Sequence, residues 1–143
     1  MTCTFFGHSD CYDLDGAILQ RAIEDLIKSG ISTFYVGHHG LFDRMVLQCL
    51  TALKKLYPHI SYSVVLAYFP KEKTVYDEYP TIYPEGQESA LPKFAIEKRN
   101  RWMITHSEYC LCYVNRTWGG AYRFAKRAKA SGLTVTNLGG IVI

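Results

Sequence analysis

Two hydrophobic periods alternate along the 143-residue chain. Short apolar runs that are rich in β-branched and aromatic residues predict strands. These runs are residues 2–6, 32–36, 60–68, 109–114 and 134–138. Between them, apolar side chains recur every three or four positions, which is typical of one buried helix face. The predicted helices run from Asp13 or Asp15 to Gly30, from about 41 to just before Pro58, from Phe94 to His106 and from about 121 to Gly132.

The order of these elements predicts the fold class. Strands and helices alternate as β-α-β-α-β-loop-α-β-α-β, and the third strand is almost continuously apolar, as strands buried on both faces are. This order predicts an α/β fold, a three-layer Rossmann-like sandwich with a mostly parallel five-stranded sheet. Residues 1–143 show no internal repeat or composition break, so we expect a single domain. Residues 69–93 hold four of the five prolines and predict a long loop, either functional or disordered.

Composition and charge narrow the function classes. The net charge of +3 is too small to indicate nucleic-acid binding by itself, and no apolar run approaches the length of a membrane span. The chain starts directly on a strand-like run without a signal peptide, so we expect a cytoplasmic protein. The five cysteines include no C-x-x-C pair, which favours reduced thiols over disulfides or a metal site. Cys110 and Cys112 alternate within a strand and should share a face. We expect no cofactor.

Unusual residues gather where a parallel sheet of this class binds ligands, outside the carboxyl ends of its strands. The segments expected there are 7–13, 37–43, 67–93 and 115–120. Gly7, His8, Ser9 and Asp10 follow the first strand. They combine a tight turn with hydrogen-bond donors and acceptors, and are therefore candidate ligand contacts. An ordinary turn with a helix cap is the alternative.

Gly37, Gly40 and Asp43 follow the second strand. Their spacing resembles half of a dinucleotide fingerprint but lacks G-x-G, so a standard NAD site is not expected. The glycines would let a phosphate or ribose reach main-chain N–H groups at a helix start. Asp43 would cap the helix, bind ribose hydroxyls or act as a catalytic acid or base. His38 is a further candidate contact, and we expect its side chain to diverge from that of His39, which disfavours a two-histidine metal site.

Two later segments add basic and glycine-rich candidates. Arg99 and Asn100 interrupt an apolar helical pattern, and a guanidinium beside an amide suits phosphate groups and base edges. A solvent-facing ion pair of Arg99 is the alternative. Arg116, Gly119 and Gly120 follow the fourth strand. Two glycines at a helix start form a candidate phosphate cradle, although the G-K-[ST] of a P-loop is missing.

The remaining charged residues have two interpretations, as functional side chains or as ordinary solvent-exposed ones. Glu88, in the long loop, is the second candidate catalytic carboxylate besides Asp43, provided that its surroundings raise its pKa. A solvated loop is the alternative for Glu88. The basic side chains of the last helix, including Arg123, are interpreted as a solvated face rather than a nucleic-acid surface.

Four segments together resemble the SLOG superfamily, in particular its small stand-alone YpsA/YoqJ-like members, which are Rossmann-like proteins. The segments are FFGHSD (5–10), FYVGHHGLFD (34–43), PKFAIEKRNRWMITHSEYCLCYV (92–114) and GGAYRFAKRAKASGLTVTNL (119–138). The resemblance implies a site for a nucleotide or nucleotide-derived ligand at the strand carboxyl ends, and association of the chain with further copies of itself. Relatives include cytokinin-activating phosphoribohydrolases, a DNA-processing protein and sensor domains for ADP-ribose-type signals in antiphage defence.

The resemblance also separates the possible functions. The residues that match the family motifs are Gly7, His8, Gly37, Gly40, Asp43, Arg99, Asn100, Gly119 and Gly120. The phosphoribohydrolases have a longer glycine motif followed by glutamate, whereas here the glycines run into Ala121. We therefore expect a sensor or sequestering module for a nucleotide or an ADP-ribose-like molecule. An N-glycosidic hydrolase or transferase acting on a nucleotide is the alternative, and a role in protein or nucleic-acid interaction is the third.

Overall fold

The computed structural model describes residues 1–69 and 75–143, and its centre is one parallel sheet. The strands are β1 (Thr2–Gly7), β2 (Thr33–Val36), β3 (Ser61–Val65), β4 (Thr81–Ile82), β5 (Tyr109–Tyr113) and β6 (Thr134–Asn137). Their order in the sheet is β4-β3-β2-β1-β5-β6, and each neighbouring pair is parallel. The predicted α/β Rossmann-like fold is confirmed, with six strands instead of five.

The sixth strand, β4, lies inside the segment that the sequence predicts to be a loop. It has two residues and pairs with β3, where Val64 N donates to Pro80 O and Leu66 N donates to Ile82 O. Three 3₁₀ turns flank it along the chain: η1 (Val75–Glu78), η2 (Gln87–Ser89) and η3 (Pro92–Phe94). Such a short edge strand forms because the neighbouring strand offers free backbone N–H and C=O groups. The local sequence therefore gives little indication of it. Residues 70–74 of the predicted loop lie outside the described residues.

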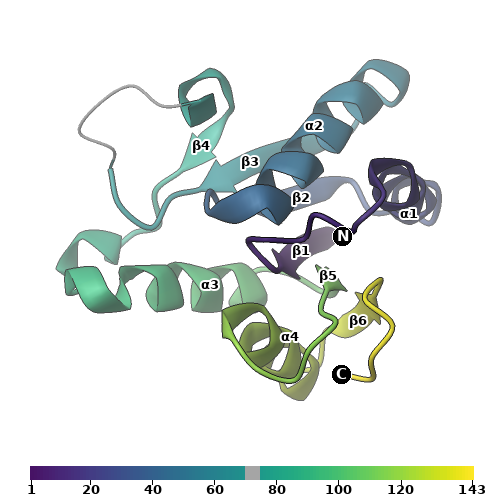
Figure 1. Ribbon diagram of the computed structural model, residues 1–143. Coiled ribbons are helices and arrows are strands. Elements are labelled where there is room, and N and C mark those ends of the chain that lie inside the picture. Colours follow the sequence, from purple (N-terminus) through teal and green to yellow (C-terminus); the bar gives the residue numbers. More distant parts are fainter. Residues whose placement is uncertain (70–74) are drawn as a thin grey trace.

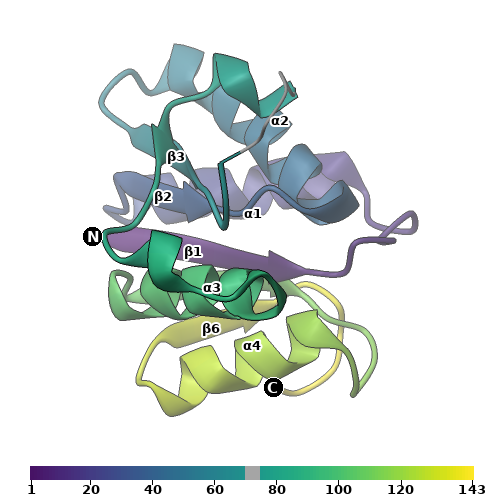
Figure 2. The same ribbon diagram turned by 90° about the vertical axis from the view of Figure 1, so that its left-hand side faces the viewer.

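Four helices cover the two faces of the sheet. They are α1 (Gly16–Lys28), α2 (Gly40–Leu56), α3 (Ala95–Thr105) and α4 (Gly120–Ala130). Helices α1 and α2 pack on one face, and α3 and α4 lie on the other (Figures 1 and 2). Asp15 is the N-cap of α1, because its carboxylate accepts a hydrogen bond from Ala17 N at 2.9 Å. Among the described residues, no helix is long and apolar enough to cross a bilayer.

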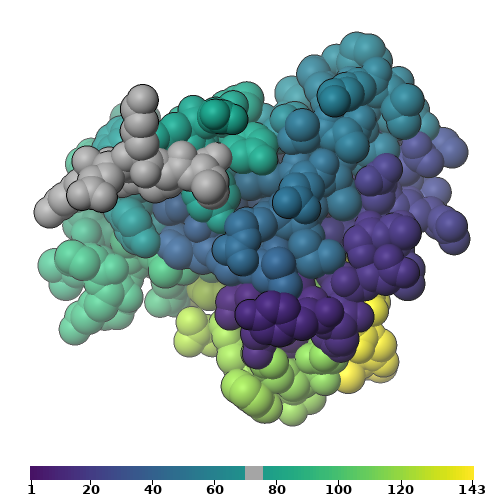
Figure 3. Space-filling model, turned by 45° about the horizontal axis from the view of Figure 1, so that its top comes forward, coloured from purple at the N-terminus to yellow at the C-terminus, as the bar shows by residue number. Residues whose placement is uncertain are grey.

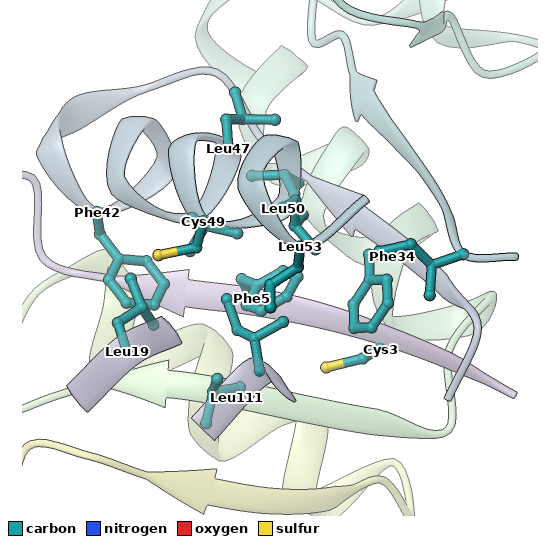
Figure 4. Close-up of a cluster of buried hydrophobic side chains, with 14 of the residues drawn as sticks. Cys3, Phe5, Leu19, Phe34, Phe42, Leu47, Cys49, Leu50, Leu53 and Leu111 are labelled. Carbon is teal, nitrogen blue, oxygen red and sulfur yellow. The ribbon is translucent and has the colours of Figure 1, made fainter. Parts of the chain in front are cut away.

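Each face of the sheet has its own apolar core. Phe5 of β1 and Phe34 of β2 pack beneath α1 and α2, in one cluster with Leu50 and Leu53 of α2 (Figure 4). Cys110 and Cys112 point to the opposite face, beneath α3 and α4, so the prediction that they share a face is confirmed. All five cysteines are free and buried. The alternation of side chains along each strand therefore supplies both cores and leaves the strand ends for other contacts.

Candidate functional site

A cavity of about 280 Å³ lies at the carboxyl ends of the central strands, between the sheet and helices α3 and α4. Its apolar wall is formed by Phe6, Ile96, Met103 and Phe124. Its polar lining includes His39, Asp43, Arg99, Asn100, Arg116 and Arg123. The residues come from four segments that are distant in the sequence, and their convergence agrees with the position that the sheet topology predicts.

Arg99 is a buried charge at the polar side of this cavity. Its side chain is 2% exposed, and its Nη1 donates to Val65 O, the last carbonyl of β3, at 2.9 Å. Its Nε donates to Asn100 Oδ1 at 2.6 Å. The sequence alternative of a solvent-facing ion pair is therefore wrong. The hydrogen bonds fix the plane of the guanidinium, which has five N–H donors in total, so donors remain that could meet a ligand in the cavity.

His39 connects Arg99 to the protein surface. Arg99 Nη2 lies 3.4 Å from His39 Nδ1, and His39 Nε2 lies 2.9 Å from the Tyr68 hydroxyl. Because a guanidinium only donates, Nδ1 must accept, and the ring proton must be on Nε2 and point to Tyr68. Burial and the nearby Arg99 lower the pKa of His39 to about 4, which keeps this neutral form at physiological pH.

Asp43 sits in the first turn of α2 and is buried beside Arg99. Its Oδ2 accepts a hydrogen bond from His39 N, the N-cap residue of α2, at 2.9 Å. Asp43 therefore serves as a cap, one of the roles that the sequence leaves open, and it also lines the cavity. Burial raises its pKa to about 6, while Arg99 and the His39 N–H act in the opposite direction. A carboxyl group with such a pKa exchanges its proton near neutral pH.

The glycines of the first two loops make room for protein atoms. A Cβ atom on Gly7 would lie 2.1 Å from the ring of Phe42, and one on Gly37 would lie 2.9 Å from Asp43 Oδ2. Gly40 has φ +89°, and a Cβ atom on it would lie 2.6 Å from Ser9 Cα. Leu41 N donates a hydrogen bond to Ser9 O. Figure 3 shows this turn after β1, in purple, against α2, in blue. Gly7, Ser9 and Gly37 line the cavity, whereas Gly40 is not among its lining residues.

The two histidines that follow β2 lie closer together than expected. The ring centroids of His38 and His39 are 4.2 Å apart, so the prediction that their side chains diverge is wrong. Both rings also lie against the ring of Tyr68, at centroid distances of 5.5 and 5.6 Å, so a shared aromatic neighbour brings them together. His38 lies outside the cavity lining and accepts a hydrogen bond from Ala67 N at 3.0 Å through Nε2. Burial lowers its pKa to about 3, so His38 is a neutral acceptor for the backbone beyond β3.

His8, by contrast, belongs to the cavity. It is 3% exposed, and its Nε2 accepts a hydrogen bond from Asn115 N at 3.2 Å. This bond ties the loop after β1 to the segment after β5. Burial and the charge of Arg116 lower the pKa of His8, which agrees with its acceptor role.

The start of α4 remains open toward the cavity. Gly119 is its N-cap with φ +92°, and a Cβ atom on Gly119 or Gly120 would meet nothing within 4 Å. Both glycines and Ala121 line the cavity. The first backbone N–H groups of a helix have no partner within the helix, and its dipole favours an anion there. The start of α4 is therefore a candidate anion-binding element, and it lines the same cavity as Arg99.

Besides Asp10, His38 and Gly40, which are not among the cavity-lining residues, three further residues differ from the sequence interpretation or were missed. Glu88 is exposed on η2 and is not among the cavity-lining residues. Arg123, interpreted as part of a solvated face, is exposed but lines the cavity. Gln87 was missed: it is 2% exposed, and its amide donates to Ala67 O and Ala95 O at 2.8 Å each. A polar residue in a proline-rich segment gives no sequence signal of such burial.

Comparison with known proteins does not assign the chain to a family. No protein-family model matches the chain, and no curated protein matches it either. The resemblance to the SLOG superfamily therefore stays a prediction, and the functional conclusion depends on the fold and the geometry of the cavity.

Proposed function

We propose that this protein binds a nucleotide or a nucleotide-derived, ADP-ribose-like small molecule in the cavity, as a sensor or as a module that sequesters the molecule. One observation carries the proposal. The buried guanidinium of Arg99 and the open N-terminus of α4 line the same cavity. A buried arginine and free helix N–H groups are both preferred partners of phosphate, and their meeting at the strand carboxyl ends supports a phosphate-bearing ligand.

The apolar wall supports an aromatic or sugar portion in the same ligand. Phe6 and Phe124 stack with their ring centroids 5.7 Å apart, and Ile96 and Met103 lie on the same wall. Binding sites for small molecules combine such apolar surface with a few placed polar groups. A purely ionic ligand such as free phosphate would leave this wall in contact with water. The wall therefore favours a molecule that has a base or sugar attached to its phosphate.

Asp43 favours a second candidate function, N-glycosidic cleavage or transfer. Its carboxyl is buried, lines the cavity and has a pKa raised to about 6 by burial. A carboxylic acid of this kind can donate a proton to a leaving base, and its carboxylate can stabilise positive charge on the sugar. Glu88 is exposed and outside the cavity lining, so we assign it no part in this chemistry.

A thermal-shift screen followed by mass spectrometry tests both functions. The probes are nucleoside monophosphates, ADP-ribose, isomers of cyclic ADP-ribose and cyclic oligonucleotides. A binding probe should raise Tm in a concentration-dependent way, because it stabilises only the folded chain. Recovery of the probe intact supports a sensor or sequestering module. Recovery as free base and sugar phosphate supports the hydrolase, and Asp43→Asn should then abolish cleavage while binding persists.

A matched pair of variants places the binding. Arg123→Gln removes a guanidinium that lines the cavity, whereas Arg127→Gln removes one that lies a helical turn away and pairs with Glu97 at 3.5 Å. We expect Arg123→Gln to weaken probe binding roughly tenfold, the loss of one charge-assisted hydrogen bond, and Arg127→Gln to leave it unchanged. Equal effects of the two variants, or no stabilisation by any probe, would contradict the proposed site. Sedimentation with and without the probe tests the expected self-association in the same samples.

A further inference from the structure

Arg116 lies at the edge of the cavity in a contact of its own. Its Nη2 is 3.2 Å from Asp10 Oδ1, and its guanidinium packs over the ring of Trp118 at 4.4 Å. Arg116 lines the cavity, whereas Asp10 and Trp118 are not among the lining residues. The ion pair therefore joins the loop after β1 to the segment before α4 and holds a cavity cation on its outer side.

The ion pair between Arg116 and Asp10 is weaker than the buried contacts that hold Arg99. The side chains of Arg116 and Asp10 are 30% and 54% exposed. Exposed ion pairs contribute little net free energy and are screened by salt. Among the described residues, Arg116 Nε is buried without a hydrogen-bond partner. Arg116 is thus poorly satisfied by Asp10, whereas the buried Arg99 is held by a backbone carbonyl and an amide oxygen.

We propose that Asp10 is a built-in competitor of the ligand for Arg116, an inference that rests on the proposed function. In the empty cavity, the Asp10 carboxylate occupies Arg116. When a phosphate group enters, Arg116 releases this carboxylate and binds the phosphate. Breaking the ion pair costs free energy, and this cost weakens the binding of the ligand. Asp10 therefore lowers the affinity of the ligand without touching it.

An anion gains affinity from Arg116 only if it binds the guanidinium more strongly than Asp10 does. A ligand carboxylate would replace the Asp10 carboxylate with an equivalent group and gain little from Arg116. A phosphate group on a monoester carries up to two negative charges and three acceptor oxygens, so it can form hydrogen bonds that a single carboxylate cannot. We therefore expect phosphate-bearing molecules to outcompete carboxylates of similar size in this cavity.

Calorimetric titration with AMP and with inorganic phosphate tests the competition in a double-mutant cycle. Asp10→Asn keeps the shape of the side chain and removes its charge, so we expect about two- to fivefold tighter binding of both probes, the worth of an exposed ion pair. Arg116→Gln should weaken binding. In the Arg116→Gln background, the Asp10→Asn change should have no effect, because the competitor then has no cation to occupy.

Tryptophan fluorescence can report whether Arg116 leaves the ring of Trp118 when a ligand binds. The chain contains two tryptophans, Trp102 and Trp118, so Trp102→Phe leaves Trp118 as the only indole. Addition of AMP should then change the Trp118 emission as the guanidinium leaves its ring. Arg116→Gln should remove this change.

The outcomes separate this inference from the proposed function. If Asp10→Asn strengthens binding equally in the presence and absence of Arg116, a general field effect explains the result and the competition is wrong. If Asp10→Asn changes nothing while Arg123→Gln weakens binding, the inference fails and the proposed function stands. If neither probe nor any nucleotide of the screen binds to the wild-type chain or the Asp10→Asn variant, both fail together.

Discussion

Two groups of glycines lie near the same cavity, and they serve opposite purposes. Gly7, Gly37 and Gly40 are filled positions, because protein atoms lie where a side chain would be. Gly119 and Gly120 are open positions, because a Cβ atom there would meet nothing within 4 Å. The first group lets two loops and Arg99 pack against each other, and the second leaves helix N–H groups exposed. Similar glycine patterns in the sequence therefore indicate either close packing or a ligand cradle, and only the surroundings distinguish them.

The largest expected effect is the loss of stability in Gly40→Ala. The new methyl group would overlap Ser9, and alanine would be strained at φ +89°. We expect the free energy of unfolding to fall by about 3 kcal/mol, which urea denaturation measures. Gly30→Ala is the control, because Gly30 has φ +109° and a Cβ atom on it would meet nothing within 4 Å. That variant should lose only the conformational contribution, about 1 kcal/mol. Equal losses in the two variants would show that position 40 is not filled.

The filled region also predicts an unusual pH dependence of stability. Folding lowers the pKa of His38 and His39 from 6.5 to about 3 and about 4, so their contribution is present above pH 6.5 and is lost as pH falls. Folding raises the pKa of Asp43 from 3.8 to about 6, so its contribution is present below pH 3.8 and is lost as pH rises through 6. Between pH 4 and pH 6 the carboxyl group therefore opposes the two histidines.

The Asp43→Asn variant tests whether Asp43 and the two histidines have opposite effects on the pH dependence of stability. Without the carboxyl group, stability should fall more steeply between pH 6 and pH 4, by about 1.4 kcal/mol per pH unit. Urea denaturation at several pH values measures the slope. Glu88→Gln removes an exposed carboxyl group and is the matched control, with a slope like that of the wild type. A slope that stays unchanged in Asp43→Asn would show that Asp43 carries its charge throughout this range.

The smallest effect on stability is expected at the open position. In Gly120→Ala, the methyl group enters free space at the first turn of α4, so the free energy of unfolding should change by less than about 0.5 kcal/mol. Its effect on AMP binding should be clear, because the methyl group would stand beside the N–H groups that we propose for phosphate. Calorimetry measures the binding. A variant that keeps both stability and AMP affinity would show that the open glycines are not a cradle.

Sequence periodicity was sufficient for the architecture. The alternation of strands and helices and the shared face of Cys110 and Cys112 follow from local patterns, and the structure confirms them. Local pattern also predicted a cap at Asp13 or Asp15, and the structure shows that it is Asp15. Arg99 and Asn100 interrupt an apolar helical pattern, which made them candidate ligand contacts. Both are buried and line the cavity. The strands, the helices and the cap could be predicted because each depends on residues within a few turns of the chain, whereas the burial of Arg99 depends on distant partners such as Val65.

The features that escaped prediction depend on distant neighbours. Strand β4 exists because β3 offers it a backbone edge, and Gln87 is buried because two carbonyls from other segments meet its amide. Arg123 and Arg127 lie on nearly the same side of α4, but only Arg123 is in the first turn, at the end of the helix that lines the cavity. The filled and open glycines could not be told apart for the same reason, since Phe42 and Ser9 are what fill Gly7 and Gly40.

The pairing of β1 with β5 has a consequence for how the site is made. Thr4 lies opposite Cys110, so the two central strands join residues about a hundred positions apart. Contacts of such separation form late, because a long loop must close before they are gained. The cavity takes lining from both sides of this junction, including His8 and Gly120. During synthesis, we therefore expect the loop after β1 to reach its final position only after β5 and the start of α4 have left the ribosome. Binding of the proposed ligand would then report that both segments have folded together.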